Sequence, residues 1–98
     1  MTTLTADGYT TGTVNARGVK LTIKSKPADK TNKNPQVVTK FMLNGRNLMT
    51  IVYRRNGYWL KDNTGKFIVA RRTLKDATAL ARNFVLRSID NAIEKGIL

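Results

Sequence analysis

Two Asn-Gly dipeptides constrain the fold of this chain more than any other feature of its sequence. Asn44-Gly45 stands between the runs QVVTKFML (36–43) and RNLMTIVYRR (46–55), and Asn56-Gly57 separates the second run from YWLKD. Both runs are rich in the β-branched and aromatic residues that favour strands. Asn-Gly is the preferred sequence of a two-residue type I′ turn, whose central residues both need a positive φ. The sequence therefore predicts consecutive antiparallel hairpins.

The other segments extend these hairpins into a single α+β domain of 98 residues. Near the N-terminus, Val19, Leu21 and Ile23 alternate with polar residues after a turn signal at Arg17-Gly18, which is typical of a half-buried strand in a hairpin. The predicted order is a flexible tail, an N-terminal hairpin, a basic loop, a four-stranded antiparallel meander and one long C-terminal helix, over residues 1–7, 8–26, 27–35, 36–72 and 73–95.

The predicted helix has both a start and a stop signal. Thr73 and Asp76 are spaced like the ends of a capping box, and Gly96 is a typical residue to end a helix. Between them, apolar residues recur at helical spacing, which is the pattern of one buried stripe. We expect this helix to pack on one face of the sheet.

Two-residue turns fix strand register, so the faces of the meander can be predicted. With Asn56-Gly57 as the loop, Arg54 lies opposite Trp59. For the next turn, a four-residue loop over 62–65 separates apolar and basic residues between the two faces better than a three-residue loop does. It also places Lys61 opposite Lys66. The helix would then cover Ile51, Tyr53, Leu60, Phe67 and Val69, and the open side would carry Arg54, Trp59, Lys61, Lys66 and Arg72. Phe41, Leu48 and Val52 also fall on the open side, where we expect the N-terminal hairpin to cover them.

Charge is the strongest functional signal. The chain has 18 basic and 6 acidic residues, a net charge of +12, and residues 36–72 hold eight of the bases and only one acid. Residues 73–98 are nearly neutral, with four bases and three acids. Such an excess favours a polyanionic partner, nucleic acid first and an acidic protein second. The strands and loops are therefore a better candidate for the binding surface than the helix.

The predicted nucleic-acid site combines basic side chains with one aromatic residue. Arginine and lysine neutralise phosphates, and a Trp ring offers a surface on which a base or sugar can lie. The alternatives are a solvated charged surface and a Trp59 that serves the core or shields the stem of Arg54. The predicted site residues are Lys40, Arg46, Arg54, Arg55, Trp59, Lys61, Lys66, Arg71 and Arg72.

Catalysis finds little support in the sequence. The chain has no His and no Cys, so the usual nucleophilic triads and zinc sites are not available. Asp90 and Glu94 share a helix face and offer a carboxylate pair for a metal-dependent nuclease, but a solvated helix surface explains them as well. We expect a protein that is not an enzyme and has no cofactor. With neither a signal peptide nor a membrane-length apolar run, we also expect a soluble cytoplasmic protein without a membrane partner.

The segment VYRRNGYWLKDNTGKFIVARRTLKDATALARNF (52–84) has a basic strand, an aromatic strand, a Gly turn and a helix that starts at Thr-Leu-Lys-Asp. In this it resembles the small DNA-binding domains of the AP2 and phage-integrase arm-binding type. The resemblance is one of pattern, covers about half of the chain with the strand order and helix of Arg46–Glu94, and implies a three-stranded sheet, backed by one helix, in the major groove. It implies groove contacts for Arg54, Trp59, Lys61, Lys66 and Arg72. The strand at 36–43 and the hairpin at 8–26 depart from it.

The sequence thus predicts a small, non-catalytic nucleic-acid-binding protein, with duplex DNA favoured over RNA. An accessory or regulatory role, as in phages and mobile elements, follows from the resemblance. One alternative is an adaptor or inhibitor that docks an acidic partner such as a nucleic-acid enzyme, and another is an RNA-binding translational regulator. The sequence leaves the oligomeric state open.

Overall fold

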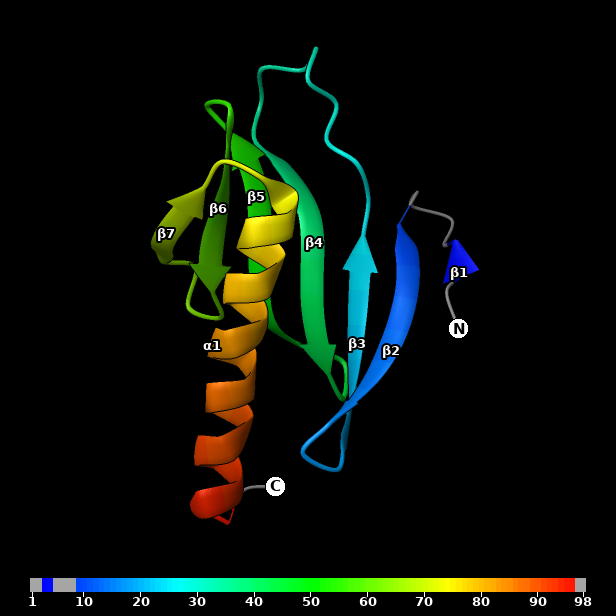
Figure 1. Ribbon diagram of the computed structural model, residues 1–98, viewed down its shortest axis with the longest axis vertical. Helices are drawn as coiled ribbons and strands as arrows, with labels where there is room; N and C mark the ends of the chain where they lie inside the picture. The colour runs from blue at the N-terminus through cyan, green and yellow to red at the C-terminus, as the bar shows by residue number, and fades with distance from the viewer. Residues whose placement is uncertain (1–2, 5–8, 97–98) are drawn as a thin grey trace.

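Seven antiparallel strands follow one another in chain order across a single sheet, and one helix packs on it (Figure 1). The structure is a computed structural model that describes residues 3–4 and 9–96. It confirms the predicted α+β meander with a C-terminal helix. The elements are β1 (Thr3–Leu4), β2 (Thr10–Ala16), β3 (Val19–Ser25), β4 (Gln36–Leu43), β5 (Arg46–Arg54), β6 (Gly57–Asp62), β7 (Phe67–Arg71) and α1 (Leu74–Glu94).

The first two predicted turns are present. Arg17 and Gly18 have φ values of 56° and 76°, and Asn44 and Gly45 have values of 51° and 79°. Each pair joins strands whose flanking residues are directly opposed, Ala16 with Val19 and Leu43 with Arg46. These are the two-residue turns with positive φ that right-twisted hairpins require.

The third turn lies one residue earlier than predicted. Arg54 pairs with Gly57, so the turn residues are Arg55 and Asn56, with φ values of 51° and 59°. The prediction that Arg54 opposes Trp59 is therefore wrong, and Val52 takes that place. A turn that lies one residue earlier changes the pairing of β5 with β6 by two residues. Because side chains alternate between faces with a period of two, the residues of β5 and β6 keep their predicted faces. Arg55 is the exception, because it lies in the turn and not in the strand.

The predicted four-residue loop between β6 and β7 is also wrong. Lys61 pairs with Phe67, and the amide of Asp62 donates to the carbonyl of Lys66 at 2.9 Å, which leaves a three-residue loop over 63–65. A bulge at Ile68 then brings Val69 opposite Leu60. Phe67 consequently lies on the side of Lys61, away from the helix, while Val69 keeps its predicted place in the core.

Helix α1 lies over β5, β6 and β7 and runs roughly along the strands (Figure 1). Thr73 is its N-cap, and its side chain accepts from the amide of Asp76 at 3.1 Å. Gly96, with a φ of 74°, ends the helix as predicted. The buried stripe of the helix repeats every four residues, and its small N-terminal members let the helix lie close to the sheet. These residues are Ala77, Ala81, Val85 and Ile89.

The N-terminal hairpin widens the sheet and does not fold over it. β3 pairs with β4, with Ile23 opposite Phe41. Phe41 is fully buried in the cluster beneath the helix, so its predicted place on the open side is wrong. Two bulges in the β4–β5 pair, at Val38 and Leu48, change the alternation that the prediction assumed.

Within the segment predicted as a flexible tail, Thr3 and Leu4 pair with β2 as the short strand β1. The other residues of that segment lie outside the described part of the chain. Among the described residues, no helix combines the length and apolar character that a membrane span requires.

Candidate nucleic-acid interface

The helix leaves one face of the sheet uncovered, and we call this the open face. On β5, Met49, Ile51 and Tyr53 belong to the core beneath the helix. Side chains alternate along a strand, so the residues between them point the other way. The register extends this side across the sheet. The open face includes the strand positions Lys24, Val37, Lys40, Thr50, Val52, Arg54, Trp59, Lys61, Phe67 and Ala70.

Three lysines form a row across the open face. Lys24 pairs with Lys40, Lys40 with Thr50, and Thr50 with Lys61. Neighbouring strands are about 4.8 Å apart, so Lys24 and Lys40 are adjacent and Lys61 lies about 10 Å further along the row. Like charges directly opposite each other destabilise a sheet. The lysine row is therefore a position where a bound anion would stabilise the protein.

The acidic residues that the structure describes lie off this face. Asp29 lies in the loop before β4, and Asp62 ends β6 opposite Met49 on the helix side. Asp76, Asp90 and Glu94 are on the helix. Within the described residues, no carboxylate occupies an open-face strand position. The single ion pair within the described residues lies elsewhere: it joins Arg17 Nε to Asp90 Oδ1 at 2.8 Å, between the β2–β3 turn and the helix.

Arg54 is held on the open face by two aromatic rings. Its guanidinium carbon lies 5.0 Å from the ring centre of Trp59 and 4.7 Å from that of Phe67. The indole Nε1 of Trp59 donates to the carbonyl of Arg54 at 3.2 Å, and the two rings meet edge to face at 6.0 Å. A guanidinium fixed in this way keeps its fork of donors while losing little conformational freedom on binding. Trp59 thus packs against Arg54, in line with the alternative that its ring shields the Arg54 side chain.

An apolar row runs beside the lysine row. Val37 pairs with Val52, Val52 with Trp59, and Trp59 with Ala70. Val52 is buried, although none of the described helices and strands packs on this face. The open face therefore offers one line of cations and, next to it, the half-buried apolar side chains of Val37, Trp59 and Ala70.

Tyr9 closes the far end of this surface. Its hydroxyl donates to the carbonyl of Val37 at 2.9 Å, and the residue is only 6% exposed. Lys26 Nζ and Lys40 Nζ lie 4.8 and 5.2 Å from its ring centre. The ring thus positions two ammonium groups at the edge of the open face, as the rings of Trp59 and Phe67 position Arg54.

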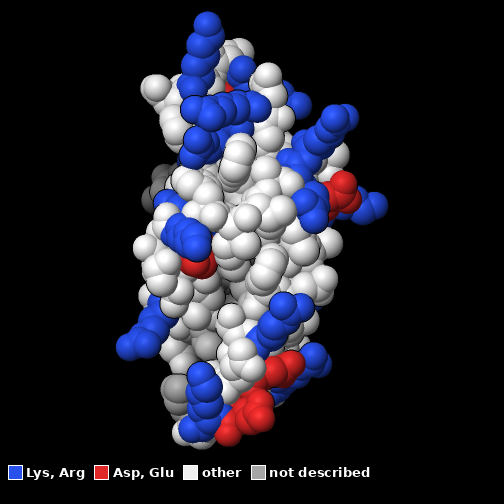
Figure 2. Space-filling model, turned by 90° about the vertical axis from the view of Figure 1, so that its left-hand side faces the viewer, with Lys and Arg blue, Asp and Glu red and all other residues white. Residues whose placement is uncertain are grey.

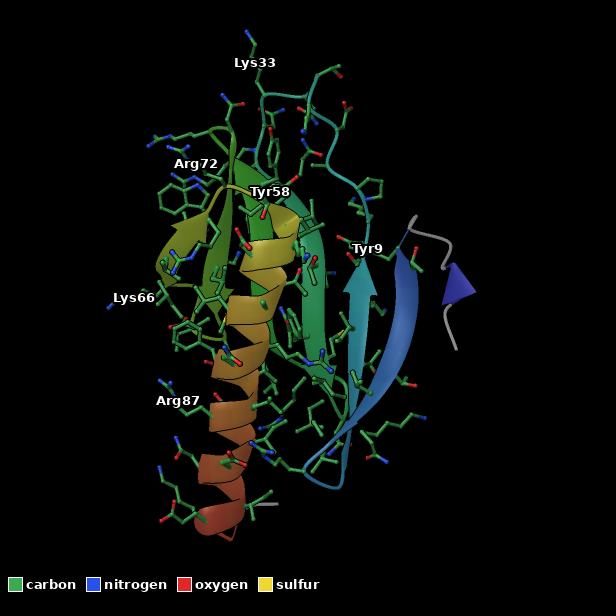
Figure 3. All side chains as sticks on the ribbon, viewed as in Figure 1. Tyr9, Lys33, Tyr58, Lys66, Arg72 and Arg87 are labelled. Atoms are coloured by element: carbon green, nitrogen blue, oxygen red, sulfur yellow. The ribbon has the colours of Figure 1, made fainter. Side chains whose placement is uncertain are left out.

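The remaining predicted residues lie elsewhere. Lys66, Arg71 and Arg72 are exposed along and beyond the β7 edge, where Figure 3 shows Lys66 and Arg72 pointing outward. Arg55 is in the β5–β6 turn at the end of the molecule. Arg46 lines a cavity of about 280 Å³ with Leu43, Ser88 and other residues on the helix side, so it does not join the open face.

The two acidic loop residues shape their loops. Asp62 Oδ1 accepts from the amide and hydroxyl of Thr64 at 2.9 and 2.6 Å and from the amide of Lys66 at 3.0 Å. These hydrogen bonds hold the pKa of Asp62 below its ordinary value, and the bond from the Thr64 hydroxyl has the largest effect. Asp29 has the same arrangement with Thr31, and its pKa is lowered for the same reason. Both carboxylates are thus engaged in loop structure.

Sequence reasoning missed three residues of this surface. Lys24 was visible as a polar position of a half-buried strand, but a loop of ten residues separates β3 from β4 and fixes no register. Phe67 was assigned to the core because a bulge cannot be read from alternation. Tyr9 resembled any aromatic strand residue, and nothing local indicated that it would contact Lys40.

Searches of protein-family models, curated proteins and solved structures find no match to this chain. The resemblance to AP2 and integrase arm-binding domains therefore stays a prediction. Within residues 9–96, no three acidic side chains gather where they would hold a metal ion.

Proposed function

We propose that this protein binds nucleic acid without catalysis and holds one strand of it across the open face. The observation that carries the proposal is the row of Lys24, Lys40 and Lys61 on a face with no described carboxylate. A phosphodiester chain supplies anions in a line, which matches cations in a line, and phosphate contacts provide most of the affinity of such proteins.

The apolar row favours a nucleic acid over a merely acidic polypeptide. A nucleic-acid strand with its phosphates on the lysine row would place sugars or bases over Trp59 and the half-buried Val37 and Ala70. Apolar and aromatic surface beside a basic groove is how proteins bind strands without reading sequence. Arg54, fixed on its two rings, adds a bidentate donor and a flat cation on which a base can stack.

The breadth of the sheet bears on how the ligand lies. The six strands β2 to β7 span about 24 Å, whereas the major groove of B-DNA is about 12 Å wide. A sheet this wide does not enter the groove face-on, unlike the three-stranded sheet that the resemblance implies. The open face fits a strand laid over it, so we favour a single-stranded segment over groove reading of a duplex.

The test compares two variants with the same loss of charge. Lys24→Gln/Lys40→Gln/Lys61→Gln removes the lysine row, and Lys75→Gln/Arg82→Gln/Lys95→Gln removes three exposed cations on and just after the helix. Affinity for a short fluorescent single strand should fall about tenfold or more in the first variant and less than about twofold in the second. Equal losses would mean that net charge alone drives binding, and the open face would not be the site.

Competition separates the remaining alternatives. Duplex DNA, single-stranded DNA and structured RNA, each competing for the same labelled strand, rank the ligands. The duplex predicted from the sequence should compete less well than a single strand of equal phosphate number. If an acidic protein partner is bound instead, the lysine-row variant should lose that partner while none of the three nucleic acids binds the wild-type protein.

A further inference from the structure

A basic cavity lies at one end of the molecule, apart from the lysine row. The loop over 26–35 rises beyond the sheet at the end where the β5–β6 turn also lies (Figure 1). Between them is a cavity of about 350 Å³, a volume at the lower end of the range of small-ligand sites. Its lining residues are Lys30, Asn32, Lys33, Asn34, Tyr53, Arg54, Arg55 and Asn56.

The lining is cationic and carries no carboxylate. Lys30 and Lys33 come from the loop, and Arg54 and Arg55 come from the end of β5 and the turn. None of the four has an ion-pair partner within the described residues. Basic side chains crowd this end of the molecule in Figure 2, whereas the largest acidic group in that view lies at the opposite end. Four unneutralised cations around one cavity repel each other, and an anion would relieve that repulsion.

The loop wall of the cavity is built by hydrogen bonds. Gln36 accepts from the amide of Asp29 at 2.8 Å and donates to its carbonyl at 2.7 Å. The amide of Asn34 donates to Asn32 Oδ1 at 3.0 Å, and Asp29, the nearest acid in this loop, is turned onto Thr31. The backbone of the loop that carries these lining residues is therefore fixed by hydrogen bonds before any ligand arrives. Figure 3 shows Lys33 at the tip of the loop, with its side chain pointing away from the sheet.

The opposite wall is held in a conformation that its sequence does not favour. Arg55 has a φ of 51°, a left-handed conformation that suits Asn or Gly and is strained for Arg. The neighbouring dipeptide Asn56-Gly57 would form the same kind of turn without that strain. The register that the protein adopts puts an arginine at the turn tip, beside the cavity.

We infer that this cavity binds a phosphate group. Lysine and arginine around a small site with amide donors from Asn32, Asn34 and Asn56 suit a compact anion with several oxygen acceptors. The site shares Arg54 with the open face, but it goes beyond the proposed function because its other cations, Lys30, Lys33 and Arg55, lie outside the lysine row. The phosphate belongs either to the end of a nucleic-acid strand or to a small phosphorylated molecule.

The experiment uses the full chain with ¹⁵N labelling at low salt. The probes are inorganic pyrophosphate and a pair of short oligonucleotides that differ only in a 5′-phosphate. Amide shifts are followed at Lys30–Asn34 and Arg55–Asn56, and emission is followed from Trp59, the only tryptophan, which contacts Arg54. The test variant is Lys30→Gln/Arg55→Asn, which keeps a residue suited to the turn. The control is Arg46→Gln/Lys95→Gln, with the same charge loss at the opposite end of the molecule, where the β4–β5 turn and the end of α1 lie (Figure 1).

Two results support the site and identify its ligand. Cavity shifts with pyrophosphate, together with about tenfold tighter binding of the 5′-phosphorylated oligonucleotide, indicate a strand end, and the test variant should lose that preference while the control keeps it. Shifts with pyrophosphate but equal binding of the two oligonucleotides indicate a small phosphorylated ligand. If no probe shifts the cavity amides of the wild-type protein, the inference is wrong, whereas the lysine-row variants still decide the proposed function.

Discussion

At the scale of single residues, two arginines adopt a backbone conformation that arginine seldom takes. Arg17 and Arg55 are both the first residue of a two-residue turn, with φ values of 56° and 51°. Arg17 is held by Asp90, while Arg55 has no acidic partner in the described structure. The strain at Arg55 is offset by the register that it allows, which opposes Ile51 to Leu60 in the core and packs the rings of Tyr53 and Tyr58 with centres 4.9 Å apart.

Replacing Arg55 should therefore stabilise the protein. In Arg55→Asn the side chain tolerates positive φ, and we expect unfolding to require about 0.5–1 kcal/mol more free energy. Arg17→Asn relieves the same strain but loses the exposed ion pair to Asp90, so its gain should be smaller. Urea titration followed by Trp59 emission measures both. A loss of stability in Arg55→Asn would show that the arginine side chain stabilises the turn in the absence of ligand.

The two loop aspartates predict how stability depends on pH. Hydrogen bonds lower the pKa of Asp62 and of Asp29 in the folded protein below the ordinary value of 3.8. A lowered folded-state pKa contributes stability that is present above the unfolded pKa and is lost as pH falls through the folded pKa. We expect the melting temperature to be insensitive to these groups at neutral pH and to fall below about pH 4. In Asp62→Asn the acid-induced fall should be smaller, and an unchanged profile would assign it to other carboxylates.

At the scale of elements, the helix is the part that sequence specifies best. Its N-cap, its buried stripe and its terminal glycine all follow from local chemistry, and each is found where the pattern places it. The strands were predicted with similar success in extent, because the Asn-Gly and Arg-Gly signals mark their ends. The register was predicted wrongly at Arg55-Asn56, where packing across the sheet outweighed local turn preference, and at the 63–65 loop, where the bulge at Ile68 breaks the alternation that the prediction assumed.

The N-cap gives a direct test at this scale. Thr73→Ala removes the acceptor for the amide of Asp76, and such caps are worth about 1 kcal/mol. Thr73→Asp keeps an acceptor beside the positive end of the helix dipole, so it should unfold at nearly the wild-type temperature. Thermal unfolding by circular dichroism compares the two. Similar losses in both variants would mean that the helix start is held by packing alone.

At the scale of the whole molecule, the sorting of side chains between faces was more predictable than their pairing. Because the register error at the β5–β6 turn amounts to two residues, Arg54, Trp59 and Lys61 were correctly grouped on the face away from the helix. The lysine row was not predictable, since Lys24 and Lys40 meet only through the pairing of β3 with β4 across a ten-residue loop. The basic cavity has the same origin, because its two walls are distant in sequence.

The row gives the proposed function a quantitative signature in its salt dependence. If Lys24, Lys40, Lys61 and Arg54 each neutralise one phosphate, the logarithm of the association constant should fall against the logarithm of salt concentration with a slope of about −3 for a single strand. A duplex bound by the same four groups would give a slope of about −3.6. Removing the three lysines should leave a slope of about −1, while the helix control Lys75→Gln/Arg82→Gln/Lys95→Gln should keep the wild-type slope. Fluorescence anisotropy between about 50 and 200 mM salt is sufficient to measure this. A wild-type slope near zero would rule out phosphate neutralisation by the open face, because released counterions are the source of the effect.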